Sequence, residues 1–244
     1  RSFDRAMPEE VNRVVTDHLS DLLFTTETSG NENLLHEGIA TDKIHFVGNC
    51  MVDTLLKHLD AARAGAPWQA FGVEPGQYAL LTLHRPSNVD DLDTLRALMG
   101  AINDVSERLP VLFPVHPRTR ERMTTGGIDI GQGITLCDPL PYLTFTGLMS
   151  EARCVLTDSG GIQEETTVLG VPCLTLRWNT ERPVTVTSGT NRLVGTDPQA
   201  IASHIDAILA GDWTTGERPP LWDGRAAERI AEVIEGFVGR NPTP

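Results

Sequence analysis

The sequence predicts an α/β protein in which parallel strands are joined by crossover helices. Short runs rich in Leu, Val and Ile alternate with longer segments of helical period along most of the chain, and this alternation is typical of strand–helix–strand units. The 244 residues, of which 40% are hydrophobic, can build one large domain or two smaller ones. Neither an internal repeat nor a low-complexity tract interrupts the pattern.

The first part of the chain contains two predicted strands and two predicted helices. We expect strands at 21–26 and 43–49 and helices at 29–38 and 51–65. We place the ends of these helices at Gly38 and Gly65, because glycine commonly follows the last helical turn. The segment APWQAFGVEPGQ, at 66–77, holds two prolines and several other turn residues. We therefore expect the chain to pass into a second unit there.

The second unit contains five predicted strands that alternate with helices. The strands are expected at 78–84, 111–116, 134–137, 154–158 and 172–176. The helices between them are expected at 91–109, 117–123, 142–152 and 161–170. Amphipathic periodicity predicts two closing helices, at 198–211 and 225–239.

Charge and composition argue against several classes of protein. A formal net charge of −13 and a sequence pI near 4.9 disfavour binding to nucleic acid or to an anionic membrane through the overall field. Cys50, Cys137, Cys154 and Cys173 are spread singly, which predicts reduced, buried thiols of a cytosolic protein and no zinc site. No apolar run approaches the roughly 18 residues that a membrane span needs. We expect a cytoplasmic protein without a metal.

The stretch VLTDSGGIQEE joins a predicted strand to a predicted helix through a glycine turn. Ligands of open α/β sheets bind at the carboxyl ends of strands, where Ser159, Gly160 and Gly161 stand. The glycines allow a ligand to approach the backbone, and the first turn of the helix favours a phosphate. Glu165 is an acceptor suited to paired sugar hydroxyls. The alternative is that Asp158 or Ser159 only caps the helix beside a tight turn.

Basic groups follow three of the predicted strands at this same edge of the sheet. They are His84 and Arg85, then His116, and then Arg177 and Arg182 with Glu181 between them. Imidazole and guanidinium groups bind diphosphates through charge-assisted hydrogen bonds, so we expect an anion site here. A single histidine at a strand end is more often structural.

Six motifs taken together resemble the non-hydrolysing UDP-N-acetylglucosamine 2-epimerases, and the resemblance covers nearly the whole chain. They are MPEEVNR, LHRPSN, FPVHP, LTDSGGIQEE, LGVPCLTLRWNTERP and GTNRLVGTD. The resemblance implies a GT-B-like fold of two Rossmann-like domains. By this plan, 1–48 is a remnant of the N-terminal domain and 49–228 is a complete C-terminal UDP-binding domain, a parallel sheet with flanking helices. The segment 229–244 is a helix and tail that cross back towards the N-terminal domain.

The resemblance also implies an activity, the interconversion of UDP-N-acetylglucosamine and UDP-N-acetylmannosamine for the supply of cell-envelope polysaccharide precursors. In that family, anti elimination of UDP with loss of the C2 proton gives a 2-acetamidoglucal, and UDP then adds back with the other C2 configuration. This chemistry implies no cofactor. The family is often dimeric, and the sequence leaves a homodimer open.

Individual site residues follow from the same resemblance. Glu9 and His84 match catalytic residues, the histidine lying near the diphosphate. The matches to UDP-binding residues are Leu140 and Phe145 at the uridine, Ser159, Gly160 and Gly161 at the phosphates, Glu165 at the ribose and Arg182 at the diphosphate. In the alternative interpretation Glu9 is a first-turn helix acid beside Pro8, and the two apolar residues only pack in the core.

The chain departs from the family pattern at several points. It starts at the arginine of an EAGLR-like motif, so we expect that upstream sequence with two of three catalytic carboxylates is missing and that the isolated chain is inactive. Val184 replaces a usual acidic residue, while HRPSN is compatible with the family's HRREN. Three rival interpretations remain open: a hydrolysing epimerase, a GT-B glycosyltransferase and a non-catalytic UDP-binding fragment.

Overall fold

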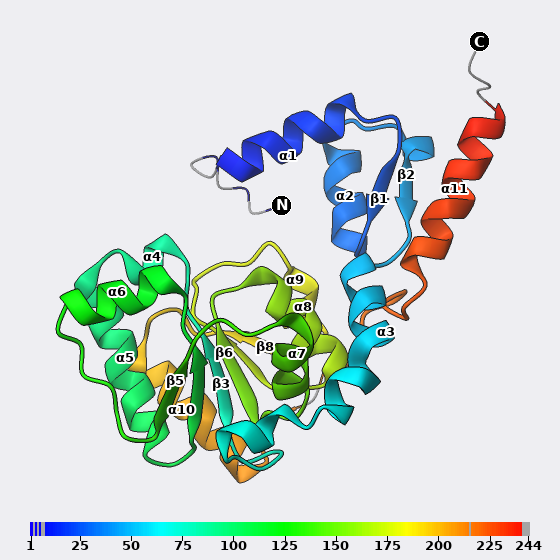
Figure 1. Cartoon of the computed structure of the whole chain (residues 1–244). Helices are drawn as coiled ribbons and strands as arrows, with labels where there is room; N and C mark the ends of the chain where they lie inside the picture. The colour runs from blue at the N-terminus through cyan, green and yellow to red at the C-terminus, as the bar shows by residue number, and fades with distance from the viewer. Residues whose placement is uncertain (2, 4, 6–7, 215, 241–244) are drawn as a thin grey trace. The chain divides into compact units, whose positions relative to one another are not determined.

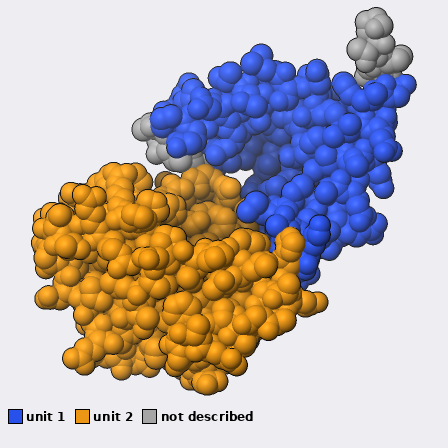
Figure 2. All heavy atoms as spheres, in the orientation of Figure 1, with its two compact units in different colours: residues 1–57, 218–244 blue, residues 58–217 orange. Residues whose placement is uncertain are grey.

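The computed structural model describes residues 1, 3, 5, 8–214 and 216–240. The chain divides into two compact units, one of residues 1–57 and 218–244 and the other of residues 58–217 (Figure 2). The division falls inside a single helix, α3 (Cys50–Ala64). The two compact units have other limits than the domains predicted from the sequence, which are 1–48, 49–228 and 229–244. Those domains follow the plan of a two-domain family, and the compact units do not test that plan. They stay a prediction.

The first unit contains a two-stranded parallel sheet and several helices (Figure 1). Its elements are α1 (Pro8–Leu19), β1 (Leu23–Thr25), α2 (Thr28–His36), a short 3-10 helix η1 (Thr41–Lys43), β2 (Ile44–Phe46), the start of α3, and α11 (Ala226–Arg240). Asp53 accepts hydrogen bonds from the first backbone N–H groups of α11, those of Ala226 at 3.1 Å and Ala227 at 2.7 Å. Both predicted strands and all three predicted helices of this unit are confirmed, whereas α1 was not predicted as an element.

The second unit is built on a six-stranded, fully parallel sheet with the strand order β5-β4-β3-β6-β7-β8. The strands are β3 (Ala79–Thr82), β4 (Val111–Pro114), β5 (Ile134–Cys137), β6 (Cys154–Thr157), β7 (Cys173–Thr175) and β8 (Asn191–Leu193). The five predicted strands are confirmed. The sixth, β8, was missed because its three residues include Asn191 and Arg192 and form no apolar run.

Helices connect the strands and cover both faces of the sheet (Figure 1). They are η2 (Pro67–Phe71), α4 (Pro86–Val89), α5 (Leu92–Ser106), α6 (Pro117–Thr125), α7 (Tyr142–Ser150), α8 (Gly160–Leu169), α9 (Pro183–Thr187) and α10 (Pro198–Ala210). The helices η2, α4 and α9 were not predicted. Each is four or five residues long and begins at a proline, so each is too short to show a helical period.

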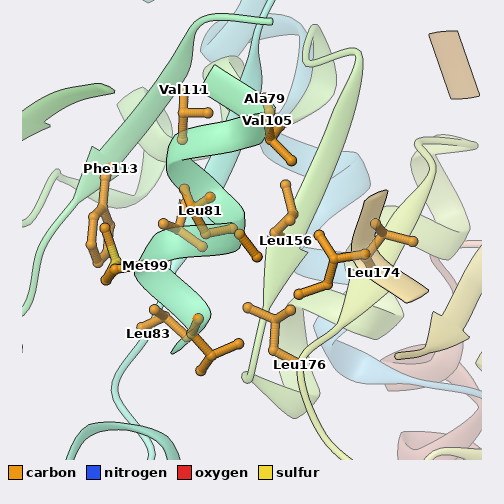
Figure 3. Close-up of a cluster of buried hydrophobic side chains, with 14 of the residues drawn as sticks. Ala79, Leu81, Leu83, Met99, Val105, Val111, Phe113, Leu156, Leu174 and Leu176 are labelled. Atoms are coloured by element: carbon orange, nitrogen blue, oxygen red, sulfur yellow. The ribbon is translucent and has the colours of Figure 1, made fainter. Parts of the chain in front are cut away.

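The core of the second unit lies on both faces of the sheet. Along β3, Ala79 and Leu81 pack on the face covered by α5 and α10, and Leu80 packs on the face covered by α7 and α8. Figure 3 shows the first of these clusters, in which Met99 and Val105 of α5 lie against strand residues. Strands buried on both faces are expected to be continuously apolar, which explains why sequence alone located them well.

The cysteines correct one expectation about burial. All four are free thiols, and Cys154 and Cys173 are fully buried as predicted. Cys137 is partly exposed, however, and Cys50 is exposed at the start of α3. Cys50 occupies the first turn of α3, where its side chain faces solvent.

Candidate functional site

The order of the strands creates a crevice in the middle of the sheet. The chain runs from β3 outward to β4 and β5, and then returns to place β6 on the other side of β3. At such a topological switch point the loops after the two central strands diverge and leave room for a ligand. His84 and Arg85 follow β3, while Asp158 and Ser159 follow β6. Two segments 74 residues apart in sequence are therefore brought together.

The carboxylate of Asp158 accepts several hydrogen bonds at this crevice. Its side chain is 0% exposed. The carboxylate accepts hydrogen bonds from the backbone N–H groups of His84 at 3.0 Å and Arg85 at 2.9 Å, and from the side-chain amide of Asn88 at 3.2 Å. Its Oδ1 also lies 2.8 Å from Nδ1 of His84. One buried carboxylate thus fixes both the backbone and the ring of the His84 loop.

The same contacts set the protonation of the pair. The hydrogen bond to Asp158 raises the pKa of His84, although burial and the charges of Arg85 and Arg177 oppose the rise. Burial by itself would raise the pKa of Asp158, but the hydrogen bonds from His84 and Arg85 outweigh it and hold that pKa below its ordinary value. The pair therefore favours an ionised aspartate beside a histidine that protonates readily.

A cavity of about 320 Å³ opens at this crevice. It is lined by Thr82, Leu83, His84, Pro114, His116, Pro139, Leu140, Phe145, Ser159 and Ile162. Five residues that the sequence analysis places at the site thus line a single hollow: His84, His116, Leu140, Phe145 and Ser159. Leu140 and Phe145 also pack against the buried cluster beneath them, as the core-packing alternative describes, and their contact with the uridine stays a prediction. Its lining combines apolar side chains, among them Phe145 and Ile162, with the polar side chains of His84, His116 and Ser159, as small-molecule sites usually do.

The glycine turn at the start of α8 directly follows Ser159, which lines the cavity. Ser159 is the N-cap residue, but its side chain makes no capping hydrogen bond, and the side chain of Asp158 is directed to His84 instead. Ser159 thus has the position of the capping alternative but makes no side-chain capping hydrogen bond. A Cβ atom added to Gly161 would meet nothing within 4 Å, so packing within the described residues does not require glycine there. The first turn of α8 is open to a ligand.

Arg182 lies beside this turn. A Cβ atom on Gly160 would come within 3.6 Å of Cζ of the Arg182 guanidinium. Nε of Arg182 lies 3.3 Å from a Glu164 carboxylate oxygen, yet it has no partner of hydrogen-bonding geometry within the described part of the chain. The contact is an ion pair without a formed hydrogen bond, and Nε itself is buried. The Arg182 side chain as a whole is 34% exposed beside Gly160, which places the guanidinium where an anion at the glycine turn would meet it.

Glu165 follows on the same helix and is only 6% exposed. Tyr142 donates a hydrogen bond to its Oε1 at 3.3 Å. Burial raises the pKa of Glu165 to about 7, with a smaller contribution from the charge of Glu164. Sequence reasoning gave no reason to expect Tyr142 here, because α7 and α8 meet only in the folded sheet.

The third strand end differs from the expectation. Arg177 donates to both carboxylate oxygens of Glu181, at 3.1 and 3.0 Å, and both side chains are buried. Burial opposes ionisation of Glu181, but the bonds from Arg177 overcome it and lower its pKa to about 2. Arg85 also lies 3.7 Å from this carboxylate. The positive charge of Arg177 is therefore already neutralised, and Arg177 does not contribute a free cation to an anion site.

Glu9 lies in the other compact unit, in the first turn of α1, and it is exposed beside Pro8. This is the local position that the helix-acid alternative describes, and the proposed catalytic role of Glu9 stays a prediction. Its neighbour Glu10 is buried and forms an ion pair with Arg13.

The residues that the structure describes form neither a metal-binding cluster nor a helix able to span a membrane. No three His, Cys, Asp or Glu side chains among them gather so that they could hold a metal ion. Over the same residues, no helix combines the length and the apolar character that crossing a bilayer requires.

One functional candidate was underrated from sequence. Asp158 was considered only as a possible helix cap, although the structure makes it the partner of His84. The usable signal was its position: an aspartate that ends one central strand can face a histidine that ends the adjacent strand at a switch point.

Comparison with known proteins gives consistent matches over most of the chain. The family model for UDP-N-acetylglucosamine 2-epimerase matches residues 1–235. The UDP-N-acetylglucosamine 2-epimerase of Methanococcus maripaludis is 39% identical over an alignment of 247 positions. The alignment covers 97% of this chain and 66% of that protein. The UDP-2,3-diacetamido-2,3-dideoxy-D-glucuronate 2-epimerase of Pseudomonas aeruginosa is 37% identical over 237 residues, covering 96% of this chain and 65% of that protein.

Solved structures match equally well. The crystal structure of Methanocaldococcus jannaschii UDP-GlcNAc 2-epimerase in complex with UDP-GlcNAc and UDP aligns with a TM-score of 0.87 at 39% identity, over 97% of this chain and 67% of that one. This likeness confirms the predicted α/β, GT-B-like fold class. The chain spans about two thirds of the length of these relatives.

Proposed function

We propose, since this chain belongs to the UDP-N-acetylglucosamine 2-epimerase family, that its protein interconverts UDP-N-acetylglucosamine and UDP-N-acetylmannosamine without net hydrolysis. The observation that carries the proposal is the cavity at the switch point. Its lining combines apolar side chains, which suit a base, with His84 and with Ser159 at the start of α8. A nucleoside diphosphate likewise combines an apolar ring with an anionic tail.

The residues take distinct roles in UDP binding. Leu140 and Phe145 contact the uracil ring, while Glu165 accepts hydrogen bonds from the ribose hydroxyls. The phosphates lie at the first turn of α8, against Ser159, Gly160 and Gly161, where N–H groups and the helix dipole stabilise negative charge. Arg182 supports the proposal because its guanidinium lies beside Gly160 and its side chain is partly exposed.

The reaction is an elimination followed by an addition. A base removes the proton from C2, and the electron pair of that bond forms a double bond between C1 and C2. The bond between C1 and the phosphate oxygen breaks, and its electron pair departs with UDP. The sugar product is a 2-acetamidoglucal. Reversal with proton delivery to the other face of C2 gives the epimer. The protein must therefore stabilise a departing diphosphate and supply acid and base groups at C2. His84 serves the first task, and Glu9 is proposed for the second.

A second substrate is favoured by one comparison. The Pseudomonas aeruginosa relative, at 37% identity, acts on a diacetamido-dideoxy-glucuronate sugar according to its name. The chemistry at C2 and the UDP leaving group would be the same, so the site described above would serve either sugar. A modified UDP-N-acetylglucosamine derivative is therefore the alternative substrate that we propose to test.

The test is turnover of UDP-N-acetylglucosamine in D₂O by the complete product of the gene, followed by NMR. We expect UDP-N-acetylmannosamine that carries deuterium at C2, because the proton removed from one face exchanges before the other face is protonated. Release of free N-acetylmannosamine would instead indicate a hydrolysing epimerase. Transfer of the sugar to an acceptor would indicate a glycosyltransferase, and binding of UDP without turnover of either sugar would indicate a non-catalytic module.

A further inference from the structure

The contact between Asp158 and His84 has a role that the proposed function does not assign. We propose that Asp158 is a positioning residue that holds His84 with its proton on Nδ1, so that Nε2 is the ring nitrogen offered to the UDP leaving group. This inference rests on the proposed function for its ligand, but its structural part concerns the protein alone.

The geometry leaves one arrangement of the ring. Oδ1 of Asp158 lies 2.8 Å from Nδ1 of His84, with the aspartate side chain fully buried and the histidine side chain 48% exposed. An ionised carboxylate can only accept a hydrogen bond, so Nδ1 must carry a proton. The other nitrogen, Nε2, is then the ring atom that can interact with a ligand in the cavity that His84 lines.

The side chain of Asp158 is held in one orientation. Its other oxygen, Oδ2, accepts from the backbone N–H groups of His84 at 3.0 Å and Arg85 at 2.9 Å, and from Nδ2 of Asn88 at 3.2 Å. Asn88 is in turn anchored by a 2.9 Å bond to the carbonyl of Leu176. The carboxylate is therefore held by three donors from the segment 84–88, and its orientation towards the imidazole is fixed.

This arrangement suits a departing diphosphate. With Nδ1–H held by a carboxylate, the ring accepts a second proton readily, and the resulting Nε2–H donates to a phosphate oxygen. The charged groups that face the ring are Asp158, which favours the charged form, and Arg85 and Arg177, which oppose it. Glu181 neutralises Arg177 through two hydrogen bonds, which weakens that opposition. No proton needs to be transferred from His84, because the hydrogen bond alone stabilises the developing charge.

The substitution Asp158→Asn tests the proposal with little change in shape. An asparagine has one acceptor and one donor group, so its oxygen must serve the clamping N–H groups and its amide must face Nδ1. The amide would donate to Nδ1 and force the neutral ring to carry its proton on Nε2. We expect inversion of the His84 tautomer and a lower His84 pKa in long-range ¹H–¹⁵N NMR spectra of the 244-residue chain.

Two further measurements keep the proposal open to contradiction. The unsubstituted chain must itself show Nδ1–H in the neutral ring, and a proton on Nε2 there would overturn the proposal without any variant. Asp91→Asn is a control for the same substitution elsewhere in the chain, since Asp91 is an exposed aspartate outside the cavity that caps α5 by accepting from the N–H of Thr94 at 2.8 Å. It should leave the His84 signals unchanged. A folded Asp158→Asn variant with an unchanged tautomer and pKa would also overturn the proposal.

Turnover then separates this inference from the proposed function. If the gene product is an epimerase, Asp158→Asn should lower kcat by about 10- to 100-fold with a smaller change in KM, since the lost interaction strengthens as charge develops. The pH above which kcat falls should move downward with the His84 pKa. An unchanged kcat would contradict the catalytic part of the proposal. Absence of turnover in the unsubstituted protein would reject the proposed function, while the NMR result would still decide the tautomer.

Discussion

Arg182 shows how a side chain can remain available to an anion although a carboxylate lies near it. Its Nε is 3.3 Å from Glu164 but lacks hydrogen-bonding geometry, and its side chain is 34% exposed. In contrast, Arg177 has both terminal nitrogens bound to Glu181. The two arginines were equivalent in the sequence, because only the fold decides which of them Glu181 reaches.

Arg182→Ala should therefore weaken UDP binding about tenfold or more, because a charge-assisted hydrogen bond contributes roughly 1.5–3 kcal/mol. Glu9→Gln should leave UDP binding unchanged, since UDP lacks the sugar on which Glu9 is proposed to act. Titration calorimetry of the 244-residue chain measures both affinities. Equal losses from the two substitutions would contradict this division of roles.

Glu165 gives a prediction about stability and pH. Burial raises its pKa in the folded chain to about 7, so the folded state binds the proton more tightly than the unfolded state does. Its contribution to stability is full below the unfolded pKa of about 4.3 and is lost as the pH rises through about 7. The Glu165→Gln variant has no such pH-dependent loss. We therefore expect its free energy of unfolding, relative to that of wild type, to rise by about 1–3 kcal/mol from pH 5 to pH 8.

Urea unfolding of both chains at the two pH values measures this gain. Glu121→Gln serves as the control, because Glu121 is an exposed residue of α6. For that variant the difference from wild type should be the same at both pH values. A difference for Glu165→Gln that does not change with pH would show that burial does not penalise the ionised carboxylate.

At the scale of elements, the turn between β6 and α8 contains a glycine that neither backbone conformation nor packing requires. Gly161 occupies the first turn of α8, where a Cβ would meet nothing within 4 Å. Neither a positive φ nor close packing explains its presence. A ligand that approaches the backbone there would explain it.

Gly161→Ala should thus maintain or raise the free energy of unfolding by up to about 1 kcal/mol, because alanine favours helix over glycine. The added methyl group should obstruct a phosphate and weaken UDP binding. Gly100→Ala is the matched control, because Gly100 is exposed in α5 and also has nothing within 4 Å. It should stabilise the chain without affecting UDP. Undiminished UDP affinity in Gly161→Ala would place the phosphates elsewhere.

The elements differ in how far the sequence predicts them. Strands such as β3 and β6 are buried on both faces and therefore appear as continuous apolar runs. The strand β8 lacks such a run, and its Asn191 is buried through hydrogen bonds to Thr175 and Thr185 rather than by apolar packing. Periodicity detects burial of apolar groups, so it misses a strand that is held by polar side chains.

At the scale of the whole molecule, the site depends on the order of the strands. Glycine turns and strand-end histidines were visible in the sequence, and His84, Leu140, Phe145 and Ser159 do line one cavity. The links between Asp158 and His84 and between Tyr142 and Glu165 were not visible. They join residues from different loops, and only the parallel sheet with its switch between β3 and β6 brings them together.

The location of bound UDP tests the central claim most directly, and a crystal structure of the 244-residue chain with UDP would give it. We expect the diphosphate at the first turn of α8, within hydrogen-bonding distance of Nε2 of His84 and the Arg182 guanidinium. The uracil ring should lie against Phe145, and the ribose hydroxyls should face Glu165. UDP bound away from this cavity, or a cavity that stays empty at millimolar UDP, would contradict the account.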